Sequence, residues 1–586
     1  MDAPSFLLLI LLTTVIALVT AVSFSFHLRK REVESSGLTE IAEMIRRGGA
    51  LFLTKKYAAT GVLAAAVSLL LFYFFDEDAQ PFMTASFLFG VLIASAADHV
   101  GMHSASAAHV HVATALKINP AKAFRLAFVS GAATGLSCAG LSLLGITLIL
   151  YILYVIFGET WETAVRSLLG FGAGISSVAL FARIGGSIFA SAMRQRGEQP
   201  DQEDSSGSIV PECVGNDVGG IAGLGTDVLE SHVLAIIAAV TLGWATIGTE
   251  SAIFFPLMIA AFGILTSVIA SAFVRTRKHI KVSKALRRGI FVNALLLLLT
   301  TFILARRFFP AAMAWEVSIA CIAGIVAALL MRFLMGRAPS SRTVGTSVLL
   351  LILLIAIAQM SAGLYGIALA TVGMLSILGI ALAADASVPV LMNASMIVSA
   401  GDGGAAAKKN AQELAQGSNS LVAKGRGYAC AASLLAALAL MVAYGDAAML
   451  PAIDLKTPAI FIGLLLGGVL PFLFSSMIAH AAQHAARTMA AAQRQQKNNA
   501  NRSLSLTATT ALLETAAPAI LAIGAPILVG FVLGSPALAG LLFGSMIAGL
   551  PLSISMLSKP SCDPAIASLL KLMAVVSLLT APLIAG

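Results

Sequence analysis

The chain has 586 residues, of which 58% are hydrophobic and only 11% are charged, and its formal net charge is +9. Ordinary globular domains carry about 25% charged residues, so this composition excludes an array of soluble domains as well as disordered and collagen-like chains. The basic residues gather between apolar runs, as in the loops of membrane proteins, which argues against a nucleic-acid partner. Five scattered cysteines without CxxC spacing indicate neither a disulfide framework nor a zinc site. The sequence therefore predicts an all-α, polytopic membrane protein.

Apolar runs long enough to cross a bilayer occur about sixteen times along the chain. The first, residues 5–26, follows Asp2 and precedes Arg29, Lys30 and Arg31, which is typical of a span with an outside N-terminus and not of a cleaved signal peptide. Some runs exceed one bilayer thickness, so we expect helices that project beyond the membrane. The predicted spans are 5–26, 58–75, 81–113, 125–157, 163–190, 214–245, 248–274, 287–305, 311–336, 345–362, 365–398, 427–444, 456–484, 511–534, 536–556 and 565–585.

Alternate loops hold most of the basic residues, whereas the loops between them, such as DEDAQ (76–80), are short and poor in cations. The positive-inside rule therefore predicts one integral membrane domain over residues 1–586, with both termini outside. Within the first cytoplasmic loop, the spacing of Leu38, Ile41 and Ile45 predicts a helix near the membrane surface. The expected cytoplasmic loops are 27–57, 114–124, 191–213, 275–286, 337–344, 399–426, 485–510 and 557–564.

Several segments at the cytoplasmic ends of the predicted spans have distinctive amino-acid sequences. They are GFGAGISSVALFARIGGSIFASA (170–192), ECVGNDVGGIAGLGTDVLES (212–231), YGIALATVGMLSILGIALAADASVP (365–389), GSNSLVAKGRGYACAASLLAALAL (417–440) and PFLFSSMIAHAAQHAARTM (471–489). These segments closely resemble those of the ion-translocating membrane pyrophosphatases, and the resemblance is collinear from about Ser36 to the C-terminus.

The resemblance implies a sixteen-helix bundle that forms a homodimer, in the bilayer of a bacterial inner (cytoplasmic) membrane. It also implies pyrophosphate hydrolysis that pumps H⁺ or Na⁺, with Mg²⁺ as the cofactor if the protein is active. Carboxylates are the ligands that such a magnesium-dependent site needs, because Mg²⁺ is a hard cation that prefers oxygen.

The family's magnesium ligands are only partly retained in the first two motifs. Where the family reads DVGAD, its two aspartates fall on Arg194 and Glu198, and a preceding lysine falls on Ser191. Where it reads DNVGDNVGD, one carboxylate becomes Glu212 and a second moves by one residue to Asp217, which rotates its side chain by about 100° on a helix. Asn216 and Gly220 occupy the other two aspartate positions of this motif.

The later motifs also retain some of the family's residues and replace others. Asp385 and Asn393 match family residues, whereas Met392 replaces an aspartate. Asn419 matches an asparagine, and Arg426 replaces a lysine, with fork geometry in place of a compact charge. Lys559 falls on a family lysine, next to Pro560 in place of an aspartate. The resemblance thus implies substrate-site remnants at Asp385, Asn419, Arg426 and Lys559, and candidate metal ligands at Glu198, Glu212, Asp217 and Asp385.

Four charged residues match the family's ion gate and coupling positions: Arg183, Asp227, Glu230 and Lys571. Asp227 and Glu230 lie three residues apart and so share one helical face. An ionisable residue within a span usually pairs with another, so we expect Asp227 to pair with Arg183 or Lys571. The alternative is that these four residues form an ion-pair network that only fixes helix packing.

The remaining polar features have open interpretations. ECVGNDVGG is also compatible with a glycine-rich packing surface. The pairs His99 and His103, and His480 and His484, have the spacing of a transition-metal site, and His109 and His111 lie near the first pair. Polar histidines at the membrane surface explain all of these residues better than a metal site does.

The sequence thus predicts a membrane pyrophosphatase-like protein in which the loss of most magnesium-binding aspartates argues against efficient hydrolysis. The alternatives to the family's enzyme are a catalytically silent homologue that binds a phosphorylated ligand or a partner protein, and a passive ion pathway. The number of retained magnesium carboxylates distinguishes the enzyme from these alternatives.

Overall fold

The structure is a computed structural model that describes residues 2–29, 36–76, 80–197, 205–275, 282–335, 341–400, 404–450, 454–495, 500–557 and 565–585. These residues form α-helices and three π-helical segments, with no strand among them, so the predicted all-α class is confirmed. The helices are α1 (Ala3–Arg29), α2 (Ser36–Phe74), α3 (Phe82–Ile118), α4 (Pro120–Leu150), α5 (Trp161–Ala179), α6 (Gly186–Gly197), α7 (Ser205–Asp217), α8 (Leu224–Ile247), α9 (Glu250–Ser271), α10 (Val282–Phe308), α11 (Ala311–Leu334), α12 (Ser341–Leu375), α13 (Leu378–Ala400), α14 (Ala405–Ala447), α15 (Pro458–Gln495), α16 (Ala500–Glu514), α17 (Ala516–Met556) and α18 (Ile566–Ala585).

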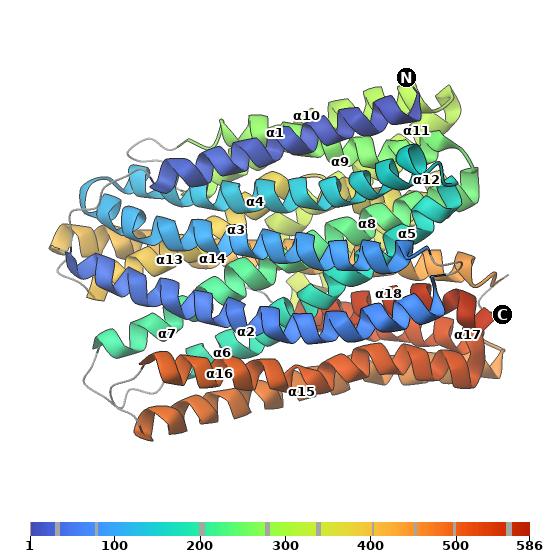
Figure 1. The fold of residues 1–586 in the computed structure, drawn as a ribbon. Coiled ribbons are helices and arrows are strands. Elements are labelled where there is room, and N and C mark those ends of the chain that lie inside the picture. Colours follow the sequence, from blue (N-terminus) through green and yellow to red (C-terminus); the bar gives the residue numbers. More distant parts are fainter. Residues whose placement is uncertain are drawn as a thin grey trace.

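The long helices lie side by side along one common direction, and both termini lie at the same end of the bundle (Figure 1). Fifteen helical runs in the described residues are long and apolar enough to cross a membrane. Helices α5, α8 and α13 form the interior of the bundle, since most of their residues are buried. By contrast, α1, α2 and α15 present many large apolar side chains on the outside, as helices that face lipid do.

One of the fifteen runs contains two spans. Within α17, Gly534 has a φ of +85°, a conformation that glycine adopts without steric cost. Glu514, before this glycine, contacts His484 of α15, and Met556, after it, contacts Ser475 of the same helix. The chain therefore runs along α15 and returns, and counting both arms of α17 gives the sixteen predicted spans.

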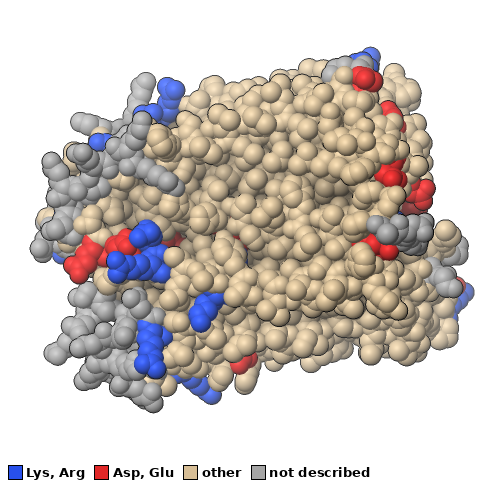
Figure 2. All heavy atoms as spheres, in the orientation of Figure 1, with Lys and Arg blue, Asp and Glu red and all other residues tan. Residues whose placement is uncertain are grey.

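Charge is distributed unevenly between the two ends of the bundle. On the face shown in Figure 2, Lys and Arg side chains gather mainly at the end where α2 and α7 begin, and Asp and Glu are prominent at the opposite end. We call the former the basic end. The two termini lie at the other end (Figure 1), which agrees with the pattern of loops that the sequence predicts.

Helices extend through several segments that were expected to be loops. Helix α2 is continuous from Ser36 to Phe74 and joins the expected surface helix to the second span. Helix α14 begins at Ala405 within the expected loop 399–426, and α15 and α16 fill most of the expected loop 485–510. At 1.5 Å per residue, the 43 residues of α14 extend roughly 65 Å. The polar segments are therefore extensions of spanning helices beyond the membrane thickness.

Two π-helical segments interrupt the central helices. Segment η2 (Leu180–Gly185) joins α5 to α6, and η3 (Val218–Gly223) joins α7 to α8, and the two segments pack against each other. A third, η1 (Tyr151–Ile156), ends α4. A π turn accommodates one extra residue and occurs frequently at functional sites. Arg183 lies within η2, and Asp227 follows η3 by four residues.

Candidate functional site

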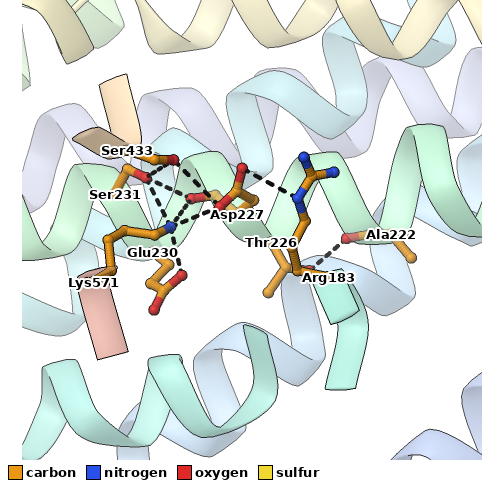
Figure 3. Close-up of polar contacts among 8 residues, drawn as sticks. All are labelled: Arg183, Ala222, Thr226, Asp227, Glu230, Ser231, Ser433 and Lys571. Carbon is orange, nitrogen blue, oxygen red and sulfur yellow. Dashed lines mark hydrogen bonds and ion pairs between the residues drawn. The ribbon is translucent and has the colours of Figure 1, made fainter. Parts of the chain in front are cut away.

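Four charged side chains meet in the interior of the bundle, where η2, α8 and α18 pack together (Figure 3). Lys571 Nζ lies 2.7 Å from Asp227 Oδ1 and 2.6 Å from Glu230 Oε2. Arg183 Nε lies 3.6 Å from Asp227 Oδ2. All four residues are at most 3% exposed. The predicted pairing of Asp227 is therefore confirmed with both candidate partners, and Glu230 completes the group.

Neutral polar groups complete the coordination of Lys571. Its ammonium group also donates to the Asp227 carbonyl oxygen and to Ser231 Oγ, at 3.0 Å each. Ser433 of α14 lies 2.9 Å from Ser231 and donates to Asp227 Oδ1 at 3.3 Å. A buried charge is tolerated when it is paired and hydrogen-bonded, and Lys571 meets both conditions.

A second buried ion pair extends this group toward α2 and α3. Lys56 of α2 contacts Asp98 of α3, and Thr226 of α8 donates to the same carboxylate. Thr226 is adjacent to Asp227, so one turn of α8 contacts both groups. We call the six charged residues the charge network: Lys56, Asp98, Arg183, Asp227, Glu230 and Lys571. It contains three cations and three carboxylates, which balance.

Between the charge network and the basic end lies a cavity of about 460 Å³. Its charged lining residues are Arg183, Arg194, Glu212, Asp385 and Arg426. They come from the η2–α6 run, α7, α13 and α14, which are far apart in the sequence. The cavity therefore brings together three of the predicted positions, Glu212, Asp385 and Arg426, and connects them to the network through Arg183.

Asp385 is bound by an arginine from a neighbouring helix. Arg332, at the end of α11, places Nη1 2.9 Å from Asp385 Oδ2 and Nη2 2.6 Å from Asp385 Oδ1. The guanidinium also lies 5.4 Å from the ring centre of Tyr428. Both residues of the pair are less than a tenth exposed. This is a bidentate, charge-assisted contact, one of the strongest that a carboxylate can make.

Asp217 belongs to a different polar cluster, beside the cavity. Asn393 donates to Asp217 Oδ1 at 2.8 Å, and His109 Nε2 lies 3.2 Å from the same oxygen. Asn216, which lines the cavity, donates to Asn393 Oδ1 at 3.1 Å. Asp217 and His109 are fully buried. Asp217 is not a lining residue of the cavity, in keeping with its one-residue shift along the helix.

Some predicted positions lie outside what the structure describes. Glu198, Lys559 and Pro560 fall in undescribed segments. For Asn419 only the helical backbone of α14 is described. Ser191, at the family's lysine position, accepts a hydrogen bond from Arg194 Nη2 at 3.4 Å.

The described residues do not fit a magnesium site. Among them, no three His, Cys, Asp or Glu side chains gather as metal ligands would. Both oxygens of Asp385 are bound by Arg332, and Asp217 is bound by Asn393 and His109. A divalent cation needs several oxygen ligands at about 2.1 Å. The described cavity wall has two carboxylates, and Arg332 binds one of them, Asp385, which leaves Glu212 as the one available ligand of this kind.

The histidines differ from the sequence-based expectation at one position. His109, which we expected at the polar surface, is fully buried against Asp217. The centres of the stacked His99 and His103 rings lie 5.9 Å apart, and the exposed His484 contacts the half-buried Glu514.

Sequence reasoning missed Arg332, Lys56, Asp98 and His109 as partners. Lys56 falls in the expected cytoplasmic loop 27–57, and Arg332 falls at the end of the predicted span 311–336, and neither was assigned a partner. Asp98 had a usable signal, because it lies inside an apolar span, where a carboxylate normally requires a cation. No comparable signal in the sequence links Arg332 to Asp385, 53 residues away.

The family model described as inorganic H⁺ pyrophosphatase matches residues 15–343 and 332–562 of the chain. A K(+)-insensitive pyrophosphate-energized proton pump of Methanosarcina mazei is 31% identical over 93% of this chain and 88% of its own length. A K(+)-insensitive pyrophosphate-energized proton pump 2 of Moorella thermoacetica is 28% identical over 91% of this chain and 88% of its own. A putative K(+)-stimulated pyrophosphate-energized sodium pump of Clostridium tetani is 29% identical over 92% of this chain and 86% of its own length.

Proposed function

The chain is an integral membrane protein that belongs to the inorganic H⁺ pyrophosphatase family, and from this premise we propose that its cavity binds a pyrophosphate-type anion above an ion path. In this proposal the charge network forms the gate of that path, and efficient magnesium-dependent hydrolysis is lost. The protein is then a silent or weakly active relative of the pumps, one that senses its ligand.

The observation that carries this proposal is the position of Arg183. Its side chain lines the cavity and also lies 3.6 Å from Asp227 in the charge network. An anion that enters the cavity competes with Asp227 for the same guanidinium. Ligand binding therefore changes the electrostatic balance of the network, which contains as many cations as carboxylates.

Loss of hydrolysis is supported by the chemistry of the cavity wall. Family magnesium positions hold Arg194, Asn216 and Gly220, and the retained Asp385 is bound by Arg332. Removal of one catalytic carboxylate commonly costs about 10² to 10⁴ in rate, when it acts as an acid or base. Several such losses leave little reason to expect fast turnover.

The second candidate is the activity named for the relatives, pyrophosphate-driven pumping of H⁺ or Na⁺. The complete set of Arg183, Asp227, Glu230 and Lys571 favours it, because a protein with no ion to move has little need for a gate. A passive ion pathway through the same network is compatible with this observation.

We extend the proposal to assembly and orientation. The family resemblance supports a homodimer. The concentration of Lys and Arg at one end supports a cytoplasmic basic end in a bacterial inner membrane, with both termini outside (Figures 1 and 2). Cross-linking in liposomes and labelling of single cysteines at each end test these two points.

The decisive experiment is an assay of phosphate release from pyrophosphate with Mg²⁺, on purified protein in liposomes, with Asp385→Asn as the control. We expect the same background release from both proteins. Release that the substitution abolishes would contradict the silent assignment and would restore the enzyme. Ion movement across the same liposomes, followed with pH- and Na⁺-sensitive dyes, then separates a pump from a passive path.

A further inference from the structure

We propose that the cavity binds its phosphoryl anion without a metal ion, and that Arg332 is a tethered cation in the place of magnesium. This inference rests on the proposed function, because it specifies how the same cavity holds its ligand. It predicts a ligand-binding protein that a metal chelator does not inactivate.

The first step concerns Asp385. The guanidinium of Arg332 contacts both of its oxygens, at 2.9 and 2.6 Å, and also lies over the ring of Tyr428. Arginine remains charged at every physiological pH. The negative charge of Asp385 is therefore balanced by the chain itself, where a soluble cation would otherwise be needed.

The second step is the exclusion of a metal ion. A Mg²⁺ ion on Asp385 would lie about 2.1 Å from an oxygen atom that Arg332 already contacts, so two cations would share one carboxylate. Like charges at such separations repel strongly in a buried site. Asp217 is turned to Asn393 and His109 and does not line the cavity. Glu212 is then the one remaining carboxylate of the described cavity wall, and a single carboxylate does not supply the several oxygen ligands that a divalent cation needs.

The third step concerns what the cavity attracts. Arg183 is balanced by Asp227, and Asp385 by Arg332. Among the described lining residues, the arginines Arg183, Arg194 and Arg426 outnumber the carboxylates Glu212 and Asp385. Arg194 comes from α6 and Arg426 from α14, so two helices supply planar donor groups that match the geometry of phosphate oxygens.

The size of the cavity agrees with this ligand class. About 460 Å³ lies within the range of roughly 300–1,000 Å³ that small-molecule sites occupy. The space accommodates a small phosphoryl anion together with water molecules. We therefore choose pyrophosphate as the probe, with inorganic phosphate and sulfate as comparison anions.

The experiment is isothermal titration of the full-length protein in detergent with sodium pyrophosphate, in one buffer with EDTA and in another with MgCl₂. We expect binding in EDTA, and weaker apparent binding with Mg²⁺, because the metal sequesters the free anion. Binding only with Mg²⁺ would overturn this inference and leave the proposed anion binding intact. Binding in neither buffer would reject the anion-binding function itself, and equal binding of sulfate would overturn the assignment to phosphoryl anions.

Arg426→Ala tests the anion contacts. A hydrogen bond to a charged group is worth roughly 1.5–3 kcal/mol, so we expect the metal-free affinity to fall about 10- to 150-fold. The matched control is Arg487→Ala, which removes an exposed arginine of α15 away from the cavity. Equal affinities for the two variants would contradict the site.

Arg332 is tested by removing its charge. Arg332→Met leaves Asp385 without its cation, so Mg²⁺ should then stimulate pyrophosphate binding. Because this variant can fail to fold, the double variant Arg332→Met with Asp385→Asn removes both charges together. We expect the double variant to bind pyrophosphate in EDTA with wild-type affinity. Loss of that binding would show that the pair holds the anion directly and would overturn the role of Arg332 as counter-cation.

Discussion

The charge network and the cavity share Arg183, yet they differ in how their charges are balanced. In the network, each carboxylate contacts a lysine or an arginine, and the three cations equal the three carboxylates. In the cavity wall, arginines outnumber carboxylates, and a cation from α11 already binds Asp385. A site that holds metal ions needs an excess of negative charge, whereas a closed network needs none. The difference teaches that two adjacent parts of one bundle can balance their buried charges in different ways.

Among the substitutions that test this comparison, we expect the largest loss of stability at Lys571. We expect Lys571→Met to lower the free energy of unfolding by about 3–5 kcal/mol, because it leaves Glu230 buried without a cation and Asp227 with only its longer contact to Arg183. Thermal unfolding in detergent measures the loss. Exchanging the charges, with Lys571→Asp and Asp227→Lys together, should recover part of the stability that either single reversal removes; no recovery would argue against the pair.

Thr226→Val tests the link between the Lys56–Asp98 pair and the rest of the charge network. This substitution removes the hydroxyl that donates to Asp98, and we expect a loss of roughly 1.5–3 kcal/mol, as for a hydrogen bond to a charged group. The matched control is Thr507→Val on α16, a buried threonine whose hydroxyl donates to the Ser503 carbonyl oxygen. Equal melting temperatures for the two variants would show that Asp98 does not depend on Thr226.

On the cavity side, Gly425→Ala tests how closely α14 packs against Asp385. A methyl group at Gly425 would lie 2.6 Å from Asp385 Cγ, too close for the pair with Arg332 to stay in place. We expect a loss of about 1–3 kcal/mol, as for other overpacked sites, together with altered pyrophosphate binding. Gly445→Ala on the same helix meets nothing within 4 Å and should leave both the stability and the binding unchanged. Similar behaviour of the two variants would contradict the close packing at Asp385.

The smallest effect is expected at the exposed ion pairs of Glu43 with Arg46 and Arg47, at 2.7 and 2.9 Å. Glu43→Gln should change the free energy of unfolding by less than about 1 kcal/mol, because water screens such pairs. Its melting temperature therefore calibrates the buried variants. A loss as large as that of Lys571→Met would mean that burial is not what makes the network important.

The sequence predicts the spans well because length and hydropathy alone determine them. The Asp227–Lys571 pair was also predictable, since ionisable residues within spans need partners. The loop ends were not, because polar helix extensions such as the first part of α14 carry no apolar signal. The contacts of Asp385 with Arg332, and of Asp217 with His109, depend on how α11 and α3 pack against α13 and α7. A single sequence contains no measure of that packing.

The π segments η2 and η3 set the register of the residues that follow them. Each accommodates one residue more than an α-helix of equal height, and η3 lies just before the turn that carries Asp227. If the same residues Val218–Gly223 formed an ordinary α-helix, the extra residue would turn the rest of α8 by about 100° relative to α7. Asp227 and Glu230 would then leave Lys571, although every charged residue would still be present in the sequence. The spacing between Glu212 and Asp227 is therefore as much a part of the site as the side chains themselves.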